Sequence, residues 1–117
     1  MVKSLDSSMG IAFSGGKTVV ISTSGGNSAI DSEKGYSYTG GSVLALMPSN
    51  GMTSETTKCN SSNGFASVGT KTTMSLSSGQ VLSVKVAGST VMTVEMPCGL
   101  SAMALYLGSN SATFAAA

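Results

Sequence analysis

The sequence predicts an all-β fold: a short right-handed parallel β-helix of about two coils, capped by an antiparallel β-hairpin or meander. Apolar residues do not recur with the 3.6-residue period of a helix. Short β-branched runs separated by Gly, Ser and Asn turns occur instead, at 18–22, 42–47, 81–86, 90–96 and 100–107. A glycine-containing pattern also recurs after 25 residues, a length that suits one coil of a solenoid.

The repeat consists of FSGGKTVVIS at 13–22 and YTGGSVLALM at 38–47. Each copy has an aromatic residue, a hydroxyl residue, a Gly-Gly pair and an apolar strand. If each copy belongs to one coil, Phe13 and Tyr38 lie one above the other on neighbouring parallel strands. We therefore expect a single domain over 1–117, divided into β-helix coils (10–52), a loop-rich connection (53–70), an antiparallel β cap (71–109) and a tail (110–117).

The cap contains a hairpin whose register follows from its alternating pattern. A three-residue loop at 88–90 would place the apolar residues of both strands on one face, with the pairs Val86–Met92, Val84–Val94 and Leu82–Met96. Lys85 and Glu95 would then form a diagonal pair on the other face. The strand at 100–107 is expected to join this sheet, with Met103, Leu105 and Leu107 inward and Tyr106 outward.

The stretch GIAFSGGKTVVIS at 10–22 raises the question of a phosphate-binding loop. Such a loop needs four residues between its first glycine and the Gly-Lys pair, followed by a helix whose N-terminal amides hold the phosphates. Here Gly10 precedes Gly16-Lys17 by one residue too many, and a β-branched run that resists helix formation follows. We interpret the Gly-Gly pair as a turn between strands, repeated at Gly40-Gly41 because the architecture repeats.

Composition excludes several classes of function. The net charge is +1, only 9% of residues are charged, and the chain has no His, Arg or Trp. A nucleic-acid binder needs clustered cations, and an ordinary Ser or Cys triad needs a His, so neither a nucleic acid nor a catalytic site is expected. No apolar run approaches a membrane span, and the first residues lack the apolar stretch of a secretory signal. Cys59 and Cys98 could form a disulfide or remain two buried thiols.

The coils resemble the closing part of a family of bacterial extracellular carbohydrate-binding parallel β-helix proteins, of the clostridial type that binds cellulose and pectin. The matching positions are Ser14-Gly15-Gly16, Gly25-Gly26-Asn27, Ala29-Ile30-Asp31, Gly40-Gly41, Ala45 and Gly51-Met52. The resemblance covers about 13–109 and implies an extracellular or cell-surface polysaccharide-binding protein. It also implies that the chain is the end of a longer protein or a shortened relative, since the family's many earlier coils are missing.

Candidate binding residues cluster between the two copies of the repeat. Tyr36 and Tyr38 are two positions apart, near Asn27 and Asp31, and could contact a sugar by ring stacking and polar bonds. The alternative role for both rings is an internal aromatic ladder, because Tyr38 occupies the position of Phe13 in the repeat. Asp31 and Glu33 could hold Ca²⁺ with neighbouring carbonyl oxygens, or could simply lie in a solvated turn.

Two functions follow from this sequence. The first is a non-catalytic module that binds a pectin- or cellulose-like polysaccharide. The alternative is a structural β protein of a virion surface or fibre. Two coils are fewer than a stable solenoid usually needs, and the first coil would leave an unpaired parallel edge near 11–22. Self-association through that edge is therefore expected in either case.

Overall fold

The computed structural model describes residues 5–7, 11–23, 30–32, 36–50 and 68–117, and for 5–7 and 30–32 it describes the backbone alone. Every element whose bounds lie within these ranges is a β-strand, so the all-β prediction is confirmed. The strands are β1 (Leu5–Ser7), β2 (Ile11–Phe13), β3 (Lys17–Ile21), β4 (Ile30–Ser32), β5 (Tyr36–Tyr38), β6 (Ser42–Pro48), β7 (Gly69–Leu76), β8 (Val81–Val86), β9 (Ser89–Glu95), β10 (Leu100–Leu107) and β11 (Thr113–Ala116).

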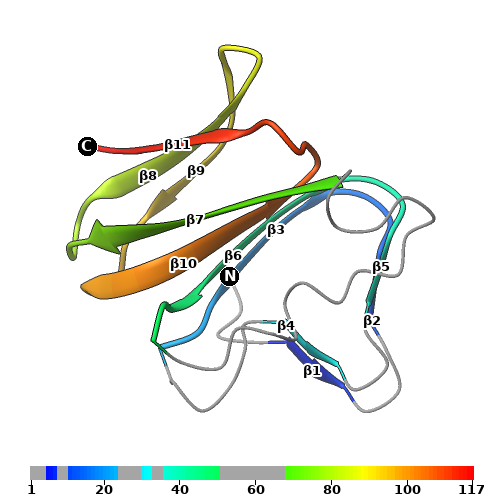
Figure 1. Cartoon of the computed structure of the whole chain (residues 1–117), viewed down its shortest axis with the longest axis horizontal. Coiled ribbons are helices and arrows are strands. Elements are labelled where there is room, and N and C mark those ends of the chain that lie inside the picture. The colour runs from blue at the N-terminus through cyan, green and yellow to red at the C-terminus, as the bar shows by residue number, and fades with distance from the viewer. Residues whose placement is uncertain (1–4, 8–10, 24–29, 33–35, 51–67) are drawn as a thin grey trace.

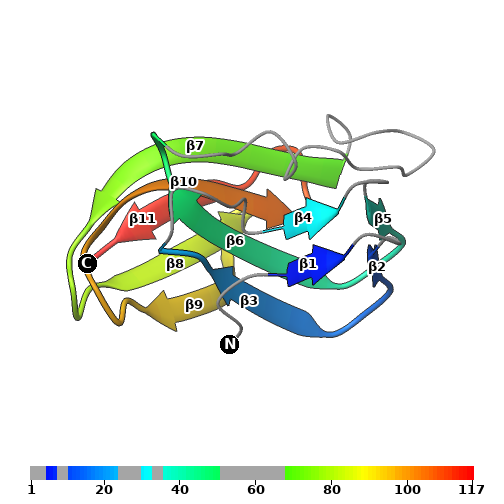
Figure 2. The same cartoon turned by 90° about the horizontal axis from the view of Figure 1, so that it is seen from below.

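These strands form four separate sheets (Figures 1 and 2). The largest has the order β3-β6-β10-β7, in which β3 and β6 are parallel and the other pairs are antiparallel. A three-stranded antiparallel sheet, β11-β8-β9, packs against one face of it. Two parallel pairs, β1-β4 and β2-β5, complete the described fold. These strands do not close into a complete coil, so the described residues do not show the predicted parallel β-helix.

The three parallel pairs share one register. Leu5 pairs with Ile30, Ile11 with Tyr36 and Lys17 with Ser42, so partners are 25 residues apart in every pair. The predicted pairing of Phe13 with Tyr38 on neighbouring parallel strands is confirmed. The first strand of each pair comes from one segment, 5–21, and the second from the next, 30–48.

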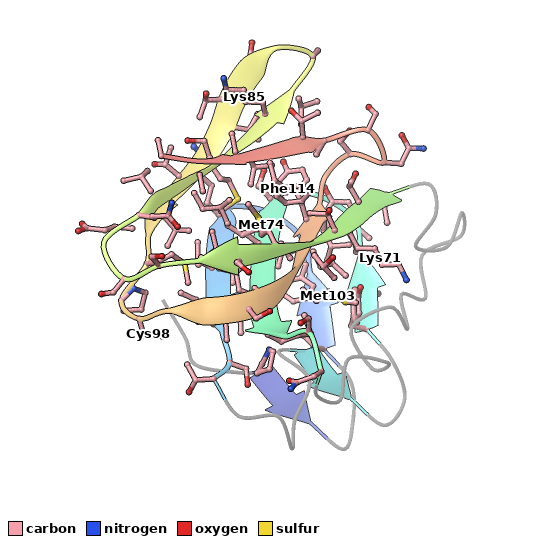
Figure 3. All side chains as sticks on the ribbon, turned by 60° about the vertical axis from the view of Figure 1, so that its left-hand side comes forward. Lys71, Met74, Lys85, Cys98, Met103 and Phe114 are labelled. Carbon is pink, nitrogen blue, oxygen red and sulfur yellow. The ribbon has the colours of Figure 1, made fainter. Side chains whose placement is uncertain are left out.

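The core consists of two clusters on the two faces of the four-stranded sheet. One cluster fills the space toward β8, β9 and β11 and contains Leu44, Leu46, Leu82, Val84, Met92, Met96 and Tyr106 among others. The other lies toward β2 and β5 and contains Phe13, Val20, Tyr36, Val43, Met47, Leu105 and Leu107. Strand β6 is buried on both faces, which explains its uninterrupted apolar run Val43–Met47. Figure 3 shows Met74 and Phe114 lying between β7 and β11 at the margin of the first cluster.

The predicted position of the strand at 100–107 was wrong. Strand β10 does not join β8 and β9 but lies between β6 and β7. Tyr106 does not point outward, because it is only 3% exposed and belongs to the first core cluster. A strand with covered faces on both sides buries both sets of alternating side chains, so alternation in LSAMALYL could not distinguish an inner face from an outer one.

The predicted hairpin register was also wrong. Val86 pairs with Ser89 across the two-residue turn Ala87-Gly88, and a bulge shifts the register between Val84 and Lys85. The shift makes Val84 the partner of Met92 and Leu82 the partner of Val94. The bulge inserts one residue on β9, which returns the apolar residues to a common face after the short turn. Lys85 faces Thr90, so the expected diagonal pair with Glu95 is absent.

Two boundaries differ from the expected division of the chain. The segment expected to be a tail contains β11, which pairs with β8 from Thr113–Lys85 to Ala116–Leu82. Strand β7 falls largely within the expected cap (71–109) but begins at Gly69, in the expected loop-rich connection, and its mostly polar sequence GTKTTMSL did not mark it as a separate strand. It lies at the edge of its sheet with Lys71 to Thr73 exposed, so it needs few apolar residues to be stable there.

Candidate functional site

The two Gly-Gly turns lie directly against each other. Gly41 has a φ of +90°, and a Cβ added to it would come within 2.7 Å of the Gly15 carbonyl carbon and 2.8 Å of the Gly16 oxygen. Ser42 N–H donates to the Gly16 oxygen at 2.9 Å, and Thr39 N–H donates to the Phe13 oxygen at 2.8 Å. Gly41 is therefore required for the close approach of the two backbones. Because Gly16 leads into strand β3 and not into a helix, the turn lacks the geometry of a phosphate-binding loop.

Tyr36 belongs to the core. It is 1% exposed, and its ring meets that of Phe13 edge to face, with centroids 5.8 Å apart and planes at 81°. A sugar contact needs an accessible ring face, which a buried ring does not offer. Of the two roles considered from the sequence, this position of Tyr36 favours the internal aromatic one.

Tyr38 differs from Tyr36 because it remains half-buried. Its hydroxyl donates to the carbonyl oxygen of Gly41 at 2.6 Å, which ties the side chain to the second Gly-Gly turn. Burial raises the pKa of Tyr38, and the nearby Tyr106 hydroxyl raises it further. Tyr106 in turn shares a hydrogen bond of 2.9 Å with the Ser42 hydroxyl. Tyr38 thus holds Gly41 through its carbonyl oxygen, and Tyr106 holds the next residue, Ser42, through its hydroxyl.

The remaining predicted site residues have no described side chains. Asn27 and Glu33 lie outside the described residues, and Asp31 is described only as a backbone position in β4. Its partner there is Asp6 of β1, which sequence reasoning missed although the 25-residue offset points to it. Among the described residues, no group of three His, Cys, Asp or Glu residues could hold a metal ion. The calcium site thus remains a prediction.

Cys98 carries a free thiol of intermediate exposure, at the turn before β10 (Figure 3). Cys59 lies outside the described residues. Within the described part of the chain, no helix is long and apolar enough to cross a membrane.

The free side of β3 is the most distinctive surface of the described chain. Strand β3 has a strand neighbour only on its β6 side among the described residues. Gly16 accepts from β6 and Ser22 donates to β6, so the alternation of a parallel strand directs the backbone groups of Thr18 and Val20 to β6 as well. Those of Lys17, Val19 and Ile21 therefore point away from it.

This edge differs from the other edges of the two larger sheets. Strand β7 carries the exposed Lys71 within its length, β9 is interrupted by a bulge, and β11 has only four residues (Figure 3). A charge, a bulge and shortness are features that prevent pairing with another chain. Strand β3 has its one charge at its first residue, Lys17, and continues Thr-Val-Val-Ile. Val20 and Ile21 are buried, so this edge is held in place from both faces of the sheet.

No protein-family model, curated protein or solved structure matches this chain. The resemblance to carbohydrate-binding β-helix proteins thus remains a prediction from the sequence motifs.

Proposed function

We propose that the chain is a non-catalytic structural module that joins another β-strand through the open edge of β3. In this proposal, 5–48 form two stacked coils of a short right-handed parallel β-helix, and the antiparallel strands cap the second coil. The observation that carries it is the single 25-residue register of the three parallel pairs, which puts β1, β2 and β3 on the same side of their partners.

The two sides of this coil pair are not equivalent. On the second-coil side, β6 already has β10 as its antiparallel neighbour, which satisfies the backbone of that strand. On the first-coil side, Lys17, Val19 and Ile21 direct their peptide groups away from the sheet. Peptide groups that point away from the sheet along an apolar, β-branched edge strand can act as a template for another strand. The four-stranded sheet therefore has a covered side at β6 and an open edge at β3 that is suited to association.

Light scattering after size-exclusion chromatography, over a range of protein concentrations, tests this proposal. We expect the chain to associate and the Val19→Pro variant to be monomeric. Proline at this position removes an N–H that points away from β6, so the ladder between β3 and β6 is kept. Val19→Thr is the matched control and should associate like the unaltered chain. A chain that stays monomeric throughout, or a Val19→Pro variant that associates equally well, would contradict the proposal.

Polysaccharide adhesion is a second candidate function, and it now depends on Tyr38. This is the one predicted sugar-contacting residue whose described side chain is half-exposed. Affinity electrophoresis against pectin, cellulose and xylan tests it, with Tyr38→Ala expected to lose retardation. Tyr38→Phe keeps the ring and loses only the bond to Gly41, so it should still be retarded. If no polysaccharide retards the unaltered chain, this function is excluded for the chain.

A further inference from the structure

The peptide groups on the free side of β3 are arranged symmetrically about Val19. Lys17, Val19 and Ile21 are the outward positions, and Val19 is the middle one. We propose that the partner of this edge is a second copy of the chain, whose β3 pairs antiparallel with β3 about a twofold axis at Val19. This inference rests on the proposed function and specifies its partner.

The capped side of the module decides between a closed pair and a fibre. Head-to-tail growth would add the β3 edge of one copy either to the far side of β6 in the next or to β7, the other edge of the same sheet. That side of β6 is occupied by β10 along Val43–Pro48. The β7 edge carries the exposed Lys71 within its length, which disfavours pairing there, so we expect β3 to pair with β3, and an interface that uses the same surface on both copies closes as a dimer. The two four-stranded sheets would join into one continuous sheet.

The twofold register matches hydrogen-bonding positions and separates like charges. Val19 would face its own counterpart, and Lys17 would face Ile21 of the other copy. Three directly opposed pairs, each exchanging two bonds, would add roughly six backbone hydrogen bonds. The two lysines are offset by four residue positions along the strand direction, so their Cα atoms would lie roughly 14 Å apart. Directly opposed like charges, which destabilise a strand pair, are therefore avoided.

The side chains at the junction would also continue an existing apolar face. Val19 and Ile21 both pack in the core cluster toward β8, β9 and β11. In the twofold register the same positions of the second copy fall on the same face of the joined sheet. The pairing would therefore extend that cluster across the axis, whereas a shift by one residue would place Val19 opposite Thr18 or Val20 and lose the match of outward peptide groups.

Spin labels measure this arrangement without disturbing buried positions. A Lys17→Cys variant in a Cys59→Ser, Cys98→Ser background places the label on an exposed side chain. We expect a dimer with one narrow distance distribution consistent with Cα atoms roughly 14 Å apart. In the same background, Val19→Cys should form a disulfide-linked dimer on mild oxidation, and Lys71→Cys on the opposite edge should not.

The outcomes separate this inference from the function on which it rests. A monomeric background protein would overturn the proposed function and this inference together. A dimer lacking the short Lys17 distance, or one linked through Lys71→Cys instead of Val19→Cys, would overturn the twofold pairing and leave association intact. A series of oligomers larger than a dimer would overturn the closed arrangement. The expected dimer, distance and cross-link together would support it.

Discussion

Gly41→Ala tests whether the two Gly-Gly turns are stacked. The new Cβ would meet Gly15 and Gly16 backbone atoms at 2.7–2.9 Å, and backbone cannot move aside as a flexible side chain can. The φ of +90° adds strain of about 1–2 kcal/mol for a residue with a Cβ, and the overlap adds about 1–3 kcal/mol. We expect the free energy of unfolding to fall by about 2–5 kcal/mol, measured by urea denaturation with circular dichroism.

Two glycines provide matched controls for this prediction. Gly79 has a φ of +86° and Gly16 a φ of +75°, and an added Cβ would meet no atom within 4 Å at either position. Alanine at each should cost only the backbone strain, about 1–2 kcal/mol. The excess cost at Gly41 measures the contact between the turns. If Gly41→Ala costs no more than Gly79→Ala, the stacking of the two segments is wrong.

Three further predictions concern polar and backbone features. Tyr106→Phe should lower the free energy of unfolding by about 0.5–1.5 kcal/mol through loss of its bond to Ser42. In a double-mutant cycle, Ser42→Ala should cost less free energy of unfolding in the Tyr106→Phe background than in the unaltered chain. Ala87 has a φ of +52° in a two-residue turn, so Ala87→Asn should raise the melting temperature by relieving about 1 kcal/mol of strain; an unchanged or lower melting temperature would argue against that turn. The raised pKa of Tyr38 favours its neutral form in the folded chain, so the associated stability is present below pH 10 and is lost as the pH rises through the folded-state pKa. Ultraviolet titration should show that Tyr38→Phe removes a tyrosine whose pKa lies above the ordinary range, and an unchanged titration would contradict the shift.

The parallel pairs could be predicted because their signal is repetition. Phe13 and Tyr38 occupy equivalent places in two copies, and equivalent residues of stacked segments become strand partners. The same offset applied further toward the N-terminus gives Asp6 and Asp31. That pair was missed although the sequence also matches there: LDSSMG at 5–10 and IDSEKG at 30–35 share Asp, Ser and Gly at the same offset.

The hairpin shows where pattern alone fails. The alternation of Leu82 and Val84 correctly predicted a buried face, because burial acts on the period of two. The register depends on the turn, and the two-residue turn requires a positive φ at Ala87, which alanine rarely adopts. A bulge compensates for the shorter loop, and a bulge leaves no mark in the alternation of apolar residues.

The candidate site was harder to predict for a related reason. Tyr36 and Tyr38 are two positions apart on one strand, and that spacing gives both rings the same side. Their different burial, 1% exposed for Tyr36 and half-buried for Tyr38, comes from what covers each position in space. The side of β3 away from β6, in contrast, has no strand neighbour among the described residues, in agreement with the unpaired edge expected near 11–22.

The central sheet has a consequence for synthesis of the chain on the ribosome. Strand β7 precedes β10 in the sequence, yet β10 lies between β6 and β7 and is the sole neighbour of β7 among the described strands. The parallel pairs can form as soon as residue 48 has emerged, whereas β7 has no place until residue 107 follows it. Completion of the sheet must therefore wait for nearly the whole polypeptide, and such non-local pairing is slow. A nascent chain arrested before β10 would hold β6 with an exposed side, which makes that interval the one in which a chaperone has most to protect.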